Sequence, residues 1–141
     1  MAKAAWRRVT RHSLGAGHFV DARGWVVNPI PPQYAAGPFG HLHLASIAPG
    51  AVRGNHRHRR LNELIFVWGG RSAWRVEGAD GGEEFELSAA ELTVVEIPAG
   101  LGHAVRNIDE HVIYLLSYYD QPYDAAHPDV ELCHLLGGSP P

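Results

Sequence analysis

The chain has 141 residues, the length of one ordinary globular domain. Its 16 glycines and 10 prolines predict many turns between short strands. A formal net charge of −3, without a long run of like charges, argues against nucleic acid as a partner. No apolar segment follows the basic N-terminus and no run of about 18 apolar residues occurs, so we expect no membrane partner.

The chain contains one cysteine, Cys133. A single cysteine cannot form an internal disulfide, which removes the usual framework of a small secreted domain. The sequence therefore predicts a reducing, cytoplasmic setting. We expect Cys133 to be a half-buried structural residue and not a nucleophile.

We expect residues 1–141 to form a single domain. Within it, residues 1–39 are predicted to be an N-terminal arm with strands of its own, residues 40–120 a barrel core, and residues 137–141 a flexible tail. The stretch from Asn28 to Gly40 contains four prolines, which exclude a helix and predict an extended surface arm.

From Gly40 onward, short β-prone runs alternate with turn signals such as Pro49-Gly50, Gly69-Gly70 and Pro98-Ala99-Gly100. No segment has apolar residues at helical spacing over three turns. The fold class is therefore all-β, and strands this short and numerous close into a barrel or sandwich. The predicted strands span His41–Ile47, Glu63–Trp68, Ser72–Val76, Glu84–Leu87, Leu92–Ile97, His103–Asn107 and Val112–Tyr119.

Four residues in two separate segments can converge on one ion. His56 and His58 are two positions apart, so on an extended chain they face the same way, roughly 7 Å apart. Glu63 begins the next predicted strand and can fold back across the turn. His103 follows a Pro/Gly corner that can bring a later strand beside the first.

Three histidine nitrogens and one carboxylate oxygen suit a divalent metal ion and leave room for water or substrate. We expect one such ion, with zinc favoured and iron, manganese or nickel as alternatives. Taken alone, His56 and His58 could instead be two solvated histidines on a strand. Glu63 and His103 make the metal site the stronger interpretation.

The two segments resemble the two signature motifs of the cupin superfamily, G-x5-HxH-x4-E-x6-G and G-x5-PxG-xx-H-xxx-N. The first motif matches at every specified position, and the second departs only at Leu92, where it has glycine. The resemblance implies a double-stranded β-helix, which is a jelly-roll barrel, with a metal ion inside. The ligands that it implies are His56, His58, Glu63 and His103.

A narrower resemblance concerns the substrate. The Arg53–His58 segment, the Asp21–Gly24 turn and the Ser117–Asp120 ending are similar to cupins that act on nucleotide-linked 4-keto sugars. These include the epimerase-type domain at the end of capsular polysaccharide reductases, which binds a metal, and small sugar 3,4-ketoisomerases, in which a histidine pair can transfer protons without one. Glu63 favours the metal-binding group.

The resemblance implies an epimerase or ketoisomerase that removes a proton beside a carbonyl. Its candidate catalytic residues are His43, Arg53 and Tyr118. His43 could be a general base if its strand face lines the barrel, and a structural role is the alternative. Arg53 could pair with a ligand phosphate or carboxylate, or could simply face solvent. Tyr118 could stack on a sugar or base at the mouth, or pack in the core.

Two other classes of function stay open. Three histidines and a glutamate also hold iron(II) in oxygen-dependent dioxygenases. A sensor or storage barrel would bind a small molecule without turnover. In each case the expected partner is a small molecule, which is a nucleotide sugar on the leading hypothesis, and the expected assembly is a homodimer.

Overall fold

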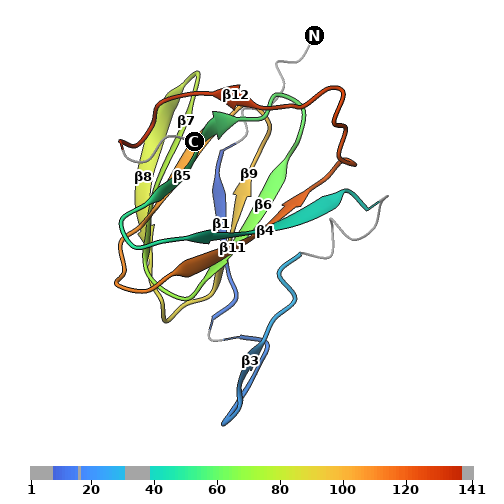
Figure 1. Cartoon of the computed structure of the whole chain (residues 1–141). Coiled ribbons are helices and arrows are strands. Elements are labelled where there is room, and N and C mark those ends of the chain that lie inside the picture. The colour runs from blue at the N-terminus through green and yellow to red at the C-terminus, as the bar shows by residue number, and fades with distance from the viewer. Residues whose placement is uncertain (1–7, 16, 31–38, 138–141) are drawn as a thin grey trace.

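The structure is a computed structural model that describes residues 8–15, 17–30 and 39–137 (Figure 1). One sheet holds, in order, β1 (Thr10–Ser13), β9 (Thr93–Ile97), β6 (Glu63–Trp68), β11 (Ile113–Tyr119) and β4 (His41–Ile47). The opposing sheet holds β12 (Glu131–Leu132), β5 (Val52–Arg57), β10 (Gly102–Asn107), β7 (Ser72–Gly78) and β8 (Gly81–Leu87). A separate hairpin pairs β2 (Phe19–Asp21) with β3 (Gly24–Val26).

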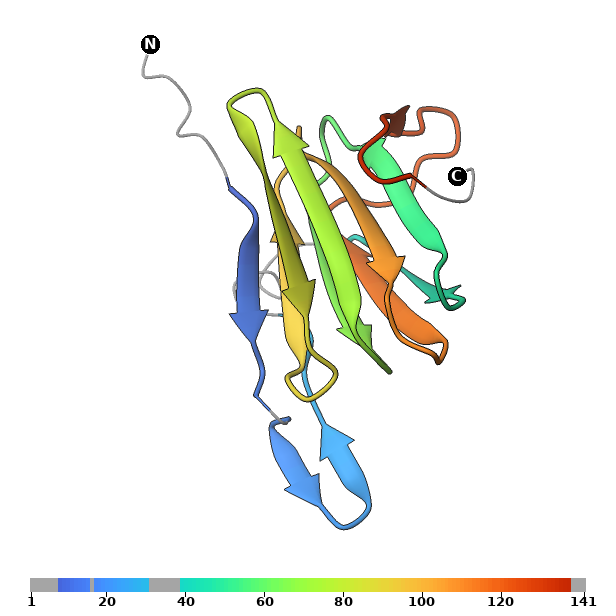
Figure 2. The ribbon, with the colours of Figure 1, turned by 90° about the vertical axis from the view of Figure 1, so that its left-hand side faces the viewer.

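The two five-stranded sheets face each other with antiparallel strand pairing throughout (Figures 1 and 2). This is the double-stranded β-helix that the cupin motifs imply, and the all-β class is confirmed. The seven predicted strands correspond to β4 and β6 through β11. Within the described ranges no helix is long and apolar enough to cross a membrane.

The hydrophobic core lies between the two sheets. The largest cluster joins inward-facing side chains from both sheets, with Ile65 and Val95 on one and Trp74 and Val105 on the other. Each Å² of apolar surface that this cluster removes from water stabilises the fold by roughly 25 cal/mol, and this burial is the main force that holds the sheets together.

A second cluster covers the outer face of the first sheet. Leu64, Phe66, Val94 and Tyr118 form it, and the N-terminal segment packs against it through residues such as Leu14. Because this sheet is buried on both faces, β6 is apolar from Leu64 to Val67 instead of alternating. The outer cluster determines which way each side chain of β11 points.

The N-terminal region contributes β1, which extends the first sheet, and the β2–β3 hairpin, which projects away from the barrel in both views (Figures 1 and 2). Strands were expected in this arm, and these three are found. The proline-rich part of the expected surface arm, residues 31–38, lies outside the described residues. So do residues 138–141 of the expected tail.

Candidate functional site

Both sheets contribute side chains to one buried cluster inside the barrel. His56 on β5 lies opposite His103 on β10 in the antiparallel ladder, His58 follows the end of β5, and Glu63 opens β6. One ligand atom from each of the four residues lies within 4.8 Å of the others. The structure therefore brings together all four residues that the cupin resemblance implies as ligands.

A β-bulge places His56 beside His103. His103 pairs with His56 but Ala104 pairs with Gly54, so Asn55 is an extra residue on β5. Gly54 has a φ of 91° and Asn55 a φ of 55°. A Cβ on Gly54 would lie 2.7 Å from the carbonyl oxygen of His103, so this close approach of the two strands requires glycine.

The Pro/Gly corner holds the other end of the cluster. The backbone N–H of Gly100 donates to the carbonyl of His58 at 2.6 Å, which ties the corner to the second histidine. This contact fixes the start of β10, and with it His103, next to the His56–His58 segment. The predicted convergence of the two motifs is thus made by backbone contacts.

The donor atoms fit a cation. Oε2 of Glu63 lies 3.3 Å from Nε2 of His58 and 3.1 Å from Nε2 of His103. Nδ1 of His58 lies 2.5 Å from the carbonyl oxygen of Asp129 and must donate to it, so a neutral His58 turns a lone pair toward the carboxylate. Within the described residues, the buried Oε2 of Glu63 and Nε2 of His58 have no well-aligned hydrogen-bond partner. The lone pair on Nε2 of His58 and the carboxylate of Glu63 repel each other, and a proton or a metal ion between the two atoms would remove this repulsion.

Electrostatics in the cluster favour the ligand-competent forms of two residues. Burial, together with the neighbouring His103, lowers the pKa of His56 to about 4, so its ring is neutral near pH 7. Burial raises the pKa of Glu63, but the adjacent His103 and His58 outweigh that effect and hold it well below its ordinary value. Burial also opposes a charge on His58, yet Glu63 and the Asp129 carbonyl raise its pKa overall.

His43 and Tyr119 form a pair beside this cluster. The Tyr119 hydroxyl lies 3.2 Å from Nε2 of His43, and the Tyr119 ring meets the His58 ring edge-on with centroids 5.2 Å apart. Burial lowers the pKa of His43. Burial and the nearby Glu63 carboxylate raise the pKa of Tyr119. The pair therefore consists of a neutral imidazole and a protonated phenol.

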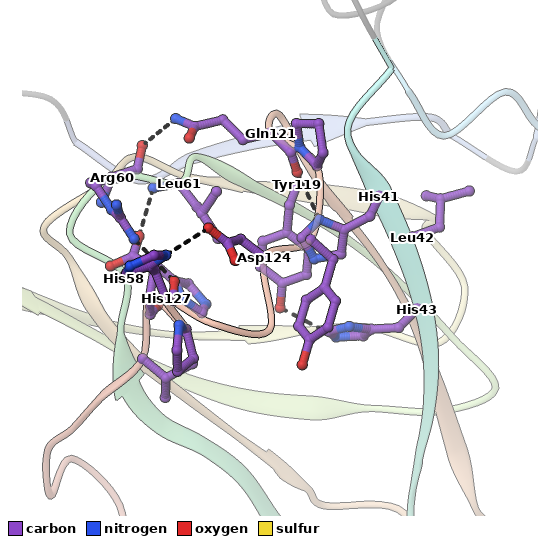
Figure 3. Close-up of a pocket in the computed structure, with 15 residues that line it drawn as sticks. His41, Leu42, His43, His58, Arg60, Leu61, Tyr119, Gln121, Asp124 and His127 are labelled. Atoms are coloured by element: carbon purple, nitrogen blue, oxygen red, sulfur yellow. Dashed lines mark hydrogen bonds and ion pairs between the residues drawn. The ribbon is translucent and has the colours of Figure 1, made fainter.

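Two cavities adjoin at this pair. An inner cavity of about 240 Å³ is lined by His56, Glu63 and His103 as well as by His43 and Tyr119. An outer cavity of about 570 Å³ shares His43 and Tyr119 and is bounded by His41 and the loop over residues 121–130 (Figure 3). A small molecule in either cavity would contact the His43–Tyr119 pair.

The structure does not bring Tyr118 to the site. Its side chain points to the outer face of the sheet, packs in the second cluster, and accepts a hydrogen bond from the Gly40 N–H at 3.3 Å. Side chains alternate along β11, and Tyr119, not Tyr118, is paired with Glu63 across the ladder. Tyr118 is therefore a core residue, which was the alternative interpretation, and its candidate catalytic role is wrong. The neighbouring Tyr119 points into the site instead.

Arg53 lies at the rim of the inner cavity and is exposed. Its Nε donates to the backbone carbonyl of Ser46 at 2.7 Å, which connects β5 in one sheet to β4 in the other. The guanidinium thus has both a structural contact and access to the cavity. Asn107, the asparagine of the second motif, donates to the backbone carbonyls of Ile47 and His111 at a corner of the barrel.

Asp129 was not predicted as part of the site. Its carboxylate accepts hydrogen bonds from three consecutive backbone N–H groups, those of Arg59, Arg60 and Leu61, directly after His58. Its carbonyl accepts the Nδ1 proton of His58. No local pattern in the sequence signals a contact across about 70 residues, although Asp129 does fall in the acidic stretch after β11.

Comparison with solved structures gives several likenesses. The capsular polysaccharide assembling protein CapF from Staphylococcus aureus matches with 25% identity and a TM-score of 0.63, over 69% of this chain and 27% of that protein. The chain thus spans little more than a quarter of CapF. Comparison with curated protein sequences finds no match.

Two smaller proteins match over more of their length. The sugar 3,4-ketoisomerase QdtA from Thermoanaerobacterium thermosaccharolyticum matches with 18% identity and a TM-score of 0.68, over 87% of this chain and 86% of that one. The 3'-monoepimerase ChmJ from Streptomyces bikiniensis matches with 16% identity and a TM-score of 0.72, over 94% and 72%. At these identities the likeness establishes the cupin fold. The family described as the polysaccharide biosynthesis C-terminal domain matches residues 19–131, and the chain belongs to that family.

Proposed function

We propose that this protein is a metal-binding cupin that epimerises or isomerises a nucleotide-linked 4-keto sugar by removing a proton beside the carbonyl. One observation carries the proposal: three of the four clustered donors, His56, Glu63 and His103, line the same inner cavity as the His43–Tyr119 pair. The fourth donor, His58, lines the adjoining outer cavity. A sugar carbonyl near the cluster would place its neighbouring carbon within reach of the pair.

The residues that would hold the ion are His56, His58, Glu63 and His103, whose facing lone pairs fit one divalent cation. Zinc is the favoured ion, because three nitrogens and one carboxylate suit it. When bound, such an ion acts as a Lewis acid that polarises a carbonyl and stabilises the negative charge that develops on its oxygen. That contribution is typically several kcal/mol.

His43 is the proposed base. Its lowered pKa keeps it neutral near pH 7, so Nε2 can accept the proton from the carbon beside the carbonyl. The electron pair of the broken C–H bond forms a C=C bond to the carbonyl carbon, and the π pair of the carbonyl moves onto its oxygen to give an enolate. Return of a proton to the opposite face of that carbon gives the epimer. For isomerisation, the enolate oxygen takes up a proton, the hydroxyl on the deprotonated carbon loses its proton and becomes the new carbonyl, and a proton adds to the former carbonyl carbon.

Tyr119 is the proposed partner of this base. Its raised pKa keeps the phenol protonated, so it can donate to Nε2 of His43 or to the enolate oxygen. The Tyr119 side chain is buried, whereas His43 is exposed where the two cavities adjoin. The proposed reaction needs a neutral base and a neutral acid, which would be His43 and Tyr119.

The names of the similar proteins support this substrate class. QdtA is a 3,4-ketoisomerase that was crystallised with TDP and with TDP-4-keto-6-deoxyglucose. ChmJ is a 3'-monoepimerase with dTDP bound, in a double mutant that replaces one histidine and one tyrosine. CapF was crystallised with the inhibitor 3-isopropenyl-tropolone, and tropolones carry two adjacent oxygens that can chelate a metal ion.

Exchange with solvent tests the reaction directly. The zinc-loaded protein is incubated in D2O with TDP-4-keto-6-deoxyglucose, and deuterium at the carbons beside the ketone is followed by NMR. We expect exchange in the parent and a loss of roughly 100-fold or more in His43→Asn. His111→Asn, an exposed histidine in the turn after β10, is the matched control and should exchange at the parental rate.

Two results would count against the proposal. Absence of exchange in the zinc-loaded parent with this and related keto sugars would exclude proton abstraction from this substrate class. Oxygen uptake by an iron-loaded protein, without exchange, would favour the dioxygenase alternative.

A further inference from the structure

The segment after β11 returns across β5, the strand that carries His56 and leads into His58. β12 pairs with β5 so that Glu131 faces Arg57 and Leu132 faces His56. In Figure 1 this segment lies at the end of the barrel opposite the β2–β3 hairpin. Its residues therefore contact the metal-ligand strand from outside the two signature motifs.

Asp129 in this segment holds His58 in two ways. Its carboxylate accepts the N–H of Arg59 at 2.9 Å, of Arg60 at 2.7 Å and of Leu61 at 3.0 Å. These bonds fix the turn that immediately follows the histidine. Its own carbonyl accepts the Nδ1 proton of the His58 ring at 2.5 Å. One residue thus fixes both the backbone and the ring.

The ring contact determines which nitrogen faces the cluster. A carbonyl oxygen can only accept, so Nδ1 keeps a proton and Nε2 is the atom directed at Glu63, 3.3 Å away. His103 differs, because its buried Nδ1 has no hydrogen-bond partner among the described residues. Of these two rings in the described part of the chain, it is therefore His58 that a hydrogen bond to a residue outside the cluster orients.

The same segment forms one wall of the outer cavity. Tyr123, His127 and Asp129 all line it, and they belong to the loop that the Asp129 carboxylate ties down. The loop is also held by Nε2 of the Gln121 amide, which donates to the Arg60 carbonyl at 3.1 Å (Figure 3). A change at Asp129 would thus alter the cavity wall and the His58 ring together.

We propose that Asp129 is a positioning residue that holds His58 with Nε2 toward the metal site. This inference rests on the metal site of the proposed function. Hydrogen-bond partners that orient a metal ligand typically change metal affinity by roughly 10 to 100-fold when they are removed. The carboxylate acts through the loop, and the Asp129 carbonyl makes the contact with the ring.

The test compares Asp129→Asn with Asp109→Asn. An amide at position 129 leaves at least one of the three N–H groups without an acceptor. Asp109 is a matched control, because its carboxylate also accepts backbone N–H groups, those of Arg71 and Glu110, beyond the opposite end of β10 from His103. Zinc affinity is measured by competition with a chromophoric chelator, and thermal unfolding shows that each variant is folded.

Imidazole ¹⁵N shifts of the metal-free proteins give a second readout that a loss of stability alone would not change. The His58 signals are assigned by comparison with His58→Gln. We expect a protonated Nδ1 in the parent and in Asp109→Asn, and a mixture of tautomers in Asp129→Asn with zinc binding at least about tenfold weaker.

Parental zinc affinity and an unchanged His58 tautomer in Asp129→Asn would overturn the inference, and so would an equal loss of affinity in Asp109→Asn. If the folded parent binds no zinc, the proposed metal site fails. The tautomer comparison then still decides whether Asp129 orients His58.

Discussion

The hydroxyl of Tyr119 lies 3.2 Å from Nε2 of His43, although the two residues come from different strands and are 76 positions apart in the chain. Strand β11 pairs with both β4 and β6, so Tyr119 lies opposite His41 on β4 and Glu63 on β6, with His43 two residues further along β4. The proposed proton-transfer pair and the donor cluster are therefore joined through one central strand.

Replacement of Tyr119 by phenylalanine should slow the exchange of the proton beside the ketone by roughly 100-fold or more, because the acid of the pair is lost. Bound zinc should stay at the parental level, since Tyr119 is not among the four donors. Deuterium incorporation and metal content are measured on the same sample.

Tyr118→Phe is the control for that experiment. It removes the acceptor for the Gly40 N–H on the opposite face of the sheet, so stability should fall by about 1 kcal/mol while exchange keeps its parental rate. Slower exchange in Tyr118→Phe than in Tyr119→Phe would contradict the assignment of the two tyrosines.

Gly54→Ala should disrupt the bulge that places His56 beside His103. The new Cβ would lie 2.7 Å from the His103 carbonyl at a φ of 91°, so we expect a loss of about 1–3 kcal/mol or more, together with weaker zinc binding. Thermal unfolding and chelator competition measure the two effects.

Gly81→Ala is the control, because it introduces backbone strain at a positive φ without a steric clash at the new Cβ. Gly81 also has a positive φ, 128°, but nothing lies within 4 Å of its Cβ position. It should lose stability without any change in zinc affinity. Equal zinc affinities in Gly54→Ala and the parent would show that the bulge does not position the ligands.

The exchange rate should depend on the protonation of His43. Burial lowers its pKa from the ordinary value of 6.5, although Glu63 opposes the shift, and only the neutral ring accepts a proton. The rate should therefore be constant at neutral pH and should fall on acidification, with a midpoint below 6.5. Bound zinc is measured at each pH, because the ligands also take up protons.

A pH profile with its midpoint clearly above the ordinary histidine value, at constant bound zinc, would exclude His43 in its lowered state as the base. An unchanged profile in His43→Asn would exclude it altogether.

Local spacing predicted the all-β class, and the resemblance to the two cupin motifs implied the barrel and the donor cluster. His56, His58, Glu63 and His103 lie at motif positions whose geometry follows from strand alternation and one Pro/Gly corner. The strands β4 and β6 were predicted with the ends that the structure has. Their apolar residues and flanking turns determine them without tertiary information.

Long-range pairing determines what the sequence could not provide. The choice between Tyr118 and Tyr119 depends on the register of β11 against β6 and on the outer cluster that covers the sheet. Gly54 and Asn55 interrupt the strand pattern of β5 in the sequence, and its pairing with β10 is visible only in the structure. The contact between Asp129 and His58 likewise exists only in the folded chain. The homodimer stays a prediction.

The most direct test of the account is elemental analysis by mass spectrometry of protein purified without a metal-affinity tag and incubated with zinc, beside His56→Ala and His103→Ala. The account predicts close to one zinc ion per chain in the parent and its loss in both variants, with each variant still folded. A folded parent that holds no metal, or variants that keep it, would contradict the central claim that these four side chains form a metal site.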